Sequence, residues 1–310
     1  MERCIDCEGP LGAATALASV AHALGQVEIV RCAACALVQR RGAPAAFDGR
    51  LYAYYADRVG LPMEALYDPL TSLSLRALLT ERLFAAPGRA LLDVGCGEGQ
   101  LVSVARSLGW NARGIDLSPH AIAICRRFGL PCEAIDIFSE TLLPASFDVV
   151  TLVEVIEHVP RPSRWIARAA ELLVPGGLLY MTTPNWASLT HRIVGDRWQA
   201  IHPEHLAYFE PATLAERVSG TGMQVSGTGM RVSGTGLELV SLLAQNVDVS
   251  AIRARWRGGE ARTDAPACQQ LRAQLAGRRG QVVKRVANGL LALTGLGDTL
   301  QLLARRQTKR

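Results

Sequence analysis

Four cysteines near the N-terminus form two pairs with the spacing of metal ligands. Cys4 and Cys7 make the first Cys-x-x-Cys pair, and Cys32 and Cys35 make the second. A segment this short cannot bury a core of its own, and four thiolates hold a structural zinc ion tetrahedrally, so that metal binding supplies the folding energy. Two unrelated reduced pairs are the alternative, whereas a redox pair would stand at the start of a thioredoxin-like unit. The sequence therefore predicts a zinc site built from these four residues.

A glycine-rich segment follows a short apolar run and precedes a helical pattern. It reads Asp93-Val-Gly95-Cys-Gly97-Glu-Gly99. Glycines let a turn be tight and let the backbone approach a ligand closely, and the helix that follows presents free N–H groups. A nucleotide-like ligand suits such a loop. The dinucleotide fingerprint would need a glycine where the chain has Gln100, so NAD is disfavoured.

A carboxylate follows the next apolar run at the distance used in nucleotide-binding βαβ units. Asp116 lies 21 residues after Gly95, and a carboxylate there can accept hydrogen bonds from both ribose hydroxyls. The alternative is that Asp116 caps the following helix. Ser118 fits that role better, because Pro119 then takes the first helical position. The spacing thus favours Asp116 as a ribose ligand.

Further titratable residues follow a third apolar run. Glu154, Glu157 and His158 come directly after residues 147–153, and ligands of open α/β sheets bind at the carboxyl ends of the strands. His158 is a candidate general base because an imidazole is partly neutral near pH 7. The alternative is a histidine that packs against the ligand or bonds to backbone.

Strand-like and helical patterns alternate through the body of the chain, which predicts a parallel sheet covered on both faces. The expected strands are residues 90–94, 112–116, 147–153 and 177–183. The expected helices are residues 101–108, 119–128 and 162–173, with helical leucine spacing over 66–84 and a further helix from about Pro211.

Taken in order, these motifs resemble class I S-adenosylmethionine-dependent methyltransferases over about residues 65–243. The motifs are Asp93-x-Gly95-x-Gly97-x-Gly99, Gly114-Ile-Asp116-Leu-Ser-Pro, Ser146-Phe-Asp148-Val-Val, Glu157-His158 and Leu173-Val-Pro-Gly-Gly-Leu. The resemblance implies an α/β fold with a seven-stranded Rossmann-like sheet and a terminal antiparallel strand. It also implies that Asp93 and the glycines hold the methionine part of the cofactor, Asp116 the ribose, and Asp136 the adenine amino group. The family usually has Gly-Asp where this chain has Ile135-Asp136, and we expect Glu154 to line the cofactor site as well.

Residues 198–209 resemble a segment of the ubiquinone-biosynthesis O-methyltransferase subgroup, which carries Glu-His-Leu-x-x-Phe. By that resemblance His205 becomes the preferred substrate-side base, alongside His158; the alternative is that His205 anchors a lid by hydrogen bonds. His202 and Glu204 lack the spacing and the second carboxylate of a metal site.

The domain organisation follows from composition and from this resemblance. We expect a zinc ribbon over residues 1–50 and a methyltransferase domain over 51–310, with a helical insertion at about 245–292 and a final strand at about 299–305. Three near-copies of Val-Ser-Gly-Thr-Gly fill residues 218–238. We interpret them as a lengthened surface loop, the alternative being a phosphate-contacting loop. The other cysteines are scattered along the chain, and we interpret them as core or surface thiols. They are Cys96, Cys125, Cys132 and Cys268.

Charge narrows the choice of partner. Residues 251–310 hold 13 bases against 3 acids, although the whole chain carries only +5. This basic tail could attract an anionic acceptor or an anionic membrane surface. The head is neutral, with Phe47 its only aromatic residue, so we expect no specific nucleic acid and only weak, salt-sensitive RNA binding through the tail.

These observations predict a cytoplasmic, zinc-stapled methyltransferase that uses S-adenosylmethionine. Its acceptor is a small molecule or a glycan precursor, methylated at oxygen rather than carbon. An RNA base methyltransferase and a catalytically silent binding module are the alternatives. The Cys-x-x-Cys pairs indicate a reducing compartment with metal binding, and the sequence has no recognisable export signal. Both observations favour the cytoplasm.

Overall fold

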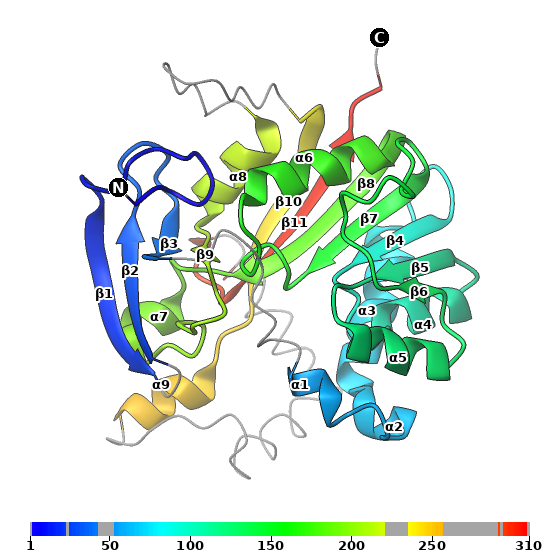
Figure 1. Cartoon of the computed structure of the whole chain (residues 1–310), viewed down its shortest axis with the longest axis horizontal. Coiled ribbons are helices and arrows are strands. Elements are labelled where there is room, and N and C mark those ends of the chain that lie inside the picture. The colour runs from blue at the N-terminus through cyan, green and yellow to red at the C-terminus, as the bar shows by residue number, and fades with distance from the viewer. Residues whose placement is uncertain are drawn as a thin grey trace.

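Seven strands form one mixed sheet in the computed structural model of the chain (Figure 1). The structure describes residues 2–22, 25–42, 53–220, 235–256, 291 and 294–308. The strand order is β10-β11-β8-β7-β4-β5-β6. The strands are β4 (Ala90–Val94), β5 (Asn111–Ile115), β6 (Cys132–Glu133), β7 (Phe147–Val153), β8 (Leu173–Pro184), β10 (Leu237–Gln245) and β11 (Thr299–Arg306).

The last strand of the chain is inserted between two earlier ones. β11 pairs antiparallel with β8 on one side and with β10 on the other, whereas β4 to β8 run parallel. Figure 1 shows β11 in red between β10 and β8. This order and the antiparallel strand confirm the expected seven-stranded methyltransferase sheet, and the strand expected at 299–305 extends to Arg306.

Helices cover both faces of the sheet because its strands are apolar on both sides. Leu91 and Val149 pack in one core cluster, and their neighbours Leu92 and Val150 pack in the other. The first face carries α3 (Pro69–Ala77), the π-helical turn η2 (Leu78–Arg82), α4 (Gln100–Ser107) and α5 (Pro119–Arg127). The second face carries α6 (Pro162–Leu172) and α8 (Pro211–Ser219). The remaining helices are α1 (Ala53–Ala56), α2 (Met63–Leu66), α7 (Leu189–Val194), η3 (Gly195–Arg197) and α9 (Val249–Trp256).

The cysteine head forms a second sheet that takes one strand from the body. Its order is β1-β2-β3-β9. In this sheet Val38 pairs with Tyr208, and Arg40 donates its N–H to the Leu206 carbonyl at 3.0 Å. The strands are β1 (Thr15–His22), β2 (Gly25–Arg31), β3 (Val38–Arg40) and β9 (Ala207–Tyr208). The head and the segment that carries His205 are therefore joined by backbone hydrogen bonds.

Two sequence expectations need correction, and others lie outside the described residues. The helical pattern at 66–84 breaks before Pro69, because the Asp68 carboxylate accepts the Thr71 N–H at 3.0 Å and starts a new helix there. The strand expected at 177–183 begins at Leu173. Residues 221–234 of the repeat at 218–238, and most of the expected insertion, lie outside the described residues. Within the described part of the chain, no helix is long and apolar enough to span a membrane.

Candidate functional site

The glycine loop between β4 and α4 requires glycine at its turning points. Gly95 has φ +70°, and a Cβ there would lie 2.5 Å from Cγ2 of Val155. Gly97 has φ +51° and donates its N–H to Oδ2 of Asp116 at 2.9 Å. Gly99 is the residue before α4 and has φ +81°, also in the left-handed region. Glycine adopts these conformations without strain. Its missing side chain also lets the loop lie close against Val155 and Asp116, which follow β7 and β5.

Asp116 braces this loop and also faces the pocket. Its Oδ1 accepts the Ser118 N–H at 2.8 Å, while Oδ2 accepts that of Gly97. Ser118 caps α5 by accepting the Ala121 N–H at 3.2 Å, as the sequence predicted. The pKa of Asp116 is raised above its usual value, because the effect of burial exceeds the lowering effect of the two backbone N–H donors. Each carboxylate oxygen keeps a second lone pair that can accept a hydrogen bond from a ligand.

A pocket of about 160 Å³ opens at the carboxyl ends of the parallel strands. Among the predicted cofactor residues, Gly95, Asp116, Asp136 and Glu154 line it, and the predicted base His158 lines it too. Its apolar walls include Ile115, Leu117, Ile135, Val155, Trp165 and the ring of Tyr55. The strand ends thus bring together residues from four separate motifs around one cavity.

Asp93, unlike these residues, is buried at the base of the loop. Its side chain is 3% exposed, and Oδ1 accepts the Thr151 hydroxyl at 2.6 Å. Burial raises the pKa of Asp93 to about 7, against the lowering effect of the Thr151 hydroxyl. Thr151 is a partner that the sequence did not reveal, because β7 lies 58 residues further along the chain.

Two glutamates lie beyond the end of β7: Glu157 is buried, whereas Glu154 is exposed. Glu154 accepts the Thr182 hydroxyl at 2.7 Å, and Glu157 accepts the Thr183 hydroxyl at 2.9 Å. Burial raises the pKa of Glu157 well above its usual value, and the Glu154 carboxylate raises it further. Glu154 has φ +54°, a strained conformation for a residue with a side chain.

The two predicted histidine bases lie against each other. The rings of His158 and His205 meet edge to face, with centroids 4.6 Å apart. Nδ1 of His158 bonds to the Glu204 carbonyl at 3.1 Å, which leaves Nε2 with a lone pair. Burial lowers the pKa of His205 to about 3, helped by the neighbouring imidazoles, and burial also lowers that of His158.

Glu157, His158 and His205 could together hold a divalent cation. Their ligand atoms lie within 4.8 Å of one another. Within the described residues, Oε1 of Glu157 and Nδ1 of His205 are buried without a hydrogen-bond partner. Two imidazoles and a carboxylate suit first-row divalent metals. The pair considered from sequence, His202 and Glu204, is not part of this cluster, and its Nδ1 and Oε2 atoms lie 3.7 Å apart.

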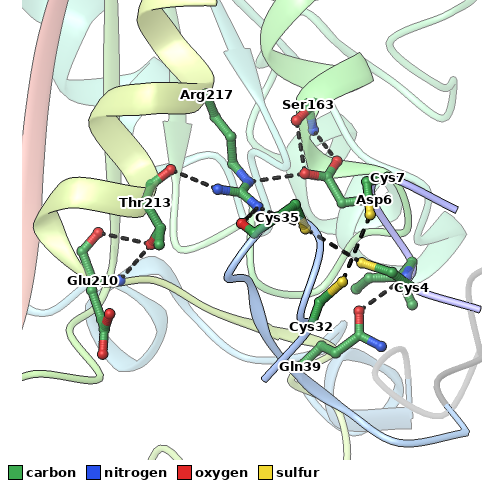
Figure 2. A network of polar contacts seen from close by, with 11 residues as sticks. Cys4, Asp6, Cys7, Cys32, Cys35, Gln39, Ser163, Glu210, Thr213 and Arg217 are labelled. Atoms are coloured by element: carbon green, nitrogen blue, oxygen red, sulfur yellow. Dashed lines mark hydrogen bonds and ion pairs between the residues drawn. The ribbon is translucent and has the colours of Figure 1, made fainter. Parts of the chain in front are cut away.

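The four head cysteines converge as the sequence predicted (Figure 2). The sulfur atoms of Cys4 and Cys35 are 3.7 Å apart, as are those of Cys7 and Cys32. Zinc–sulfur bonds of ~2.3 Å in a tetrahedron place two sulfurs ~3.8 Å apart, whereas a disulfide needs ~2.05 Å. The cysteines therefore fit a tetrahedral zinc ion.

A second cysteine cluster lies under the glycine loop. The sulfurs of Cys96, Cys125 and Cys132 lie within 4.8 Å of one another, so these thiols are not scattered as the sequence suggested. The fold brings them together because α5 and β6 pack against the loop, and Cys125 donates to the Gly97 carbonyl at 3.3 Å. Cys268 lies outside the described residues.

The sheet order, the glycine loop and the carboxylate after β5 define the class I methyltransferase fold. A family model described as a methyltransferase domain matches residues 70–226, about half of the chain. The chain belongs to this methyltransferase domain family, which confirms the resemblance seen in the sequence.

Two relatives of the same name support this assignment. The ubiquinone biosynthesis O-methyltransferase of Burkholderia thailandensis is 32% identical over 153 residues, covering 44% of this chain and 66% of that protein. The enzyme of the same name from Xanthomonas campestris is 39% identical over 108 residues, covering 33% of this chain and 45% of its own length. This chain therefore spans just under two thirds of the first relative.

Among solved structures, a chain from the complex of the Haloferax volcanii Trm112 methyltransferase activator with a methyltransferase shares the fold. Its TM-score is 0.54 at 17% identity, with 85% of this chain and 100% of that chain covered.

We predict one zinc ion per chain in the head, held by Cys4, Cys7, Cys32 and Cys35. Metal analysis of protein expressed with ample zinc should give one equivalent, and Cys32→Ser with Cys35→Ser should abolish it, because two thiolates cannot complete a tetrahedral site. Serine at Cys96 and Cys125 is the matched control and should leave one equivalent. Zinc retained in the first double variant would falsify the assignment.

A pH-dependent loss of stability should trace to Asp93. Its pKa is near 7 in the folded chain and 3.8 in the reference state, so between these values the folded state holds a proton that the unfolded state releases. As the pH rises between these two values, this group should lower the free energy of unfolding by about 1.4 kcal/mol per pH unit. The decrease should level off near pH 7. Asp93→Asn should gain stability relative to the wild type between pH 5 and 7, as measured by urea unfolding; a constant difference would contradict it.

Proposed function

We propose that the chain is an S-adenosylmethionine-dependent O-methyltransferase acting on a small molecule or a glycan precursor. The observation that carries this proposal is the glycine loop braced by Asp116 at the mouth of a pocket formed by four strand ends. The name of the curated relatives, ubiquinone biosynthesis O-methyltransferase, supports transfer to oxygen. No observation favours an RNA base as acceptor.

The cofactor residues follow from the positions of the lining groups. We assign the ribose hydroxyls to Asp116 and the adenine amino group to Asp136, whose Oδ1 already accepts the Phe138 N–H at 2.8 Å. Ile135 and Leu117 supply apolar contacts for the adenine ring. Gly95, Gly97 and Gly99 form the loop proposed for the methionine part. Asp93 precedes this loop and is held by the Thr151 hydroxyl, and Glu154 lines the pocket.

Methyl transfer from a sulfonium is an in-line displacement, so the protein mainly positions the two reactants and accepts a proton. His158 is the proposed proton acceptor, because it lines the pocket and its Nε2 keeps a lone pair. His205 has a pKa of about 3 and is a weak base. We therefore assign His205 to the positioning of His158 rather than to proton transfer.

We also propose the domain division expected from the sequence, with the zinc ribbon ending near residue 50. In this proposal the zinc ion stabilises the fold of the head. The basic residues of the tail favour binding of an anionic acceptor or of an anionic surface.

A metal-assisted form of the same reaction is the second candidate. It is favoured by the unpartnered Oε1 of Glu157 and Nδ1 of His205, which lie beside the pocket residue His158. When bound, a divalent ion supplies Lewis-acid activation of an acceptor hydroxyl. The three side chains would then serve as its ligands, and His158 would not be needed as a base.

Loss of the Asp116 carboxylate should weaken cofactor binding by roughly 1.5–3 kcal/mol, the range for charge-assisted hydrogen bonds. The measurement is calorimetric titration of Asp116→Ala with S-adenosylhomocysteine. Glu140→Ala, an exposed carboxylate, should bind like the wild type. An unchanged dissociation constant for Asp116→Ala would remove this residue from the site, and methyl transfer to a panel of phenolic and sugar acceptors tests the reaction itself.

The second candidate predicts that the zinc-loaded chain binds one further equivalent of Mn²⁺. Mn²⁺ is the probe because it avoids thiolate sites, and the electron paramagnetic resonance signal of free Mn²⁺ reports its binding. Glu157→Gln should weaken binding by about tenfold or more, whereas His202→Gln, in the same segment as His205, should not. No loss of the free signal in the wild type would remove the metal-assisted form and leave the methyltransferase proposal standing.

A further inference from the structure

The first cysteine pair is tied to helix α6 through the residues between its two cysteines. Asp6 accepts the backbone N–H of Ser163 at 2.9 Å and the Ser163 hydroxyl at 2.8 Å. The residue before α6, Arg161, makes no side-chain cap of its own. Asp6 therefore caps α6 from the head, where a carboxylate also favours the positive end of the helix dipole.

The second cysteine pair is tied to helix α8 through Arg217. Its Nε donates to Oδ2 of Asp6 at 2.9 Å, and its Nη1 donates to the Thr213 carbonyl at 2.8 Å. Its Nη2 approaches both the carbonyl and the sulfur of Cys35, at 3.3 and 3.5 Å. Figure 2 shows the guanidinium between Thr213 and Asp6, beside Cys35. The Arg217 and Asp6 side chains are 2% and 0% exposed.

The Arg217 guanidinium makes contacts beyond its ion pair with Asp6. Asp6 already has two donors from Ser163, and one N–H of Arg217 completes its partners. The second arm of the guanidinium instead reaches Cys35. Metal ligation requires cysteine as thiolate, and one Zn²⁺ with four thiolates gives the whole site a net charge of −2. A buried guanidinium at one sulfur lowers the electrostatic cost of that charge.

We propose that Arg217 is a positioning residue of the cysteine centre, which stabilises the Cys35 thiolate and so makes zinc affinity depend on the docking of the head on α6 and α8. The inference rests on the assignment of zinc to the head, and it goes beyond the methyltransferase proposal because no part of it involves the acceptor. Its test is therefore separable from methyl transfer.

A purely structural role for Arg217 predicts a different result from the proposed one. Arg217→Met alone leaves the buried Asp6 carboxylate without its cation, which destabilises the fold whichever role is correct. The double variant Asp6→Asn with Arg217→Met restores charge balance but still lacks the donor at Cys35. If Arg217 only pairs with Asp6, zinc affinity in this double variant equals that of the wild type.

The experiment measures zinc affinity of the full chain by competition with a chromophoric chelator. We expect the double variant to bind zinc about 10- to 100-fold more weakly, the range for loss of an outer-shell partner of a metal ligand. Binding of S-adenosylhomocysteine should be unchanged. The matched control is Arg31→Met with Glu210→Gln, which removes another ion pair at the head–body interface, 2.8 Å long and without a contact to sulfur. Its zinc affinity should match the wild type.

A second variant covers the case in which the double variant does not fold. Arg217→Lys keeps a cation for Asp6 but lacks the arm that reaches Cys35, so it should also bind zinc more weakly than the wild type. In the wild-type chain loaded with ¹¹³Cd, a scalar coupling between the metal and an Arg217 Nη proton would report the N–H···S bond directly. Wild-type zinc affinity in the variants that fold, or absence of this coupling, overturns the proposal.

Discussion

Parallel alignment of the central strands is the constraint on which the site depends. In a parallel sheet the carboxyl ends of β4, β5, β7 and β8 must meet at one edge. Residues placed just after each strand are then neighbours, however far apart they are in the chain. The Gly97 N–H can reach Asp116 only because Asp93 pairs with Gly114 and Val94 with Ile115 in register. The chemistry of the pocket thus follows from strand pairing.

Local signals predicted the parts of the site that are encoded within a few residues. The loop glycines, the cap at Ser118 and the carboxylate at Asp116 each carry their conformational reason in their own sequence, and the structure has them where expected. The expected bounds of β4 and β7 match the structure and those of β5 differ by one residue, whereas β8 begins four residues before its expected start.

Contacts between distant segments could not be predicted in the same way. Thr151 beneath Asp93 and Arg217 beside Asp6 are polar residues within ordinary strand or helix patterns, and nothing in those patterns names their partners. His205 illustrates the same limit. The sequence predicted His205 as a substrate-side base, but it gave no sign that burial among other rings lowers the pKa of this imidazole, because burial is a property of the packed chain.

The position of β11 has a consequence for how the chain folds. β8 and β10 flank β11 and have no ladder with each other, so the sheet has a gap until residues 299–306 arrive. During synthesis β8 therefore exposes an unpaired edge of apolar residues, which is the kind of surface that recruits other strands. The order of assembly is fixed by topology: the glycine loop and its carboxylate can form early, but β10 joins the sheet last, together with the strand beside it.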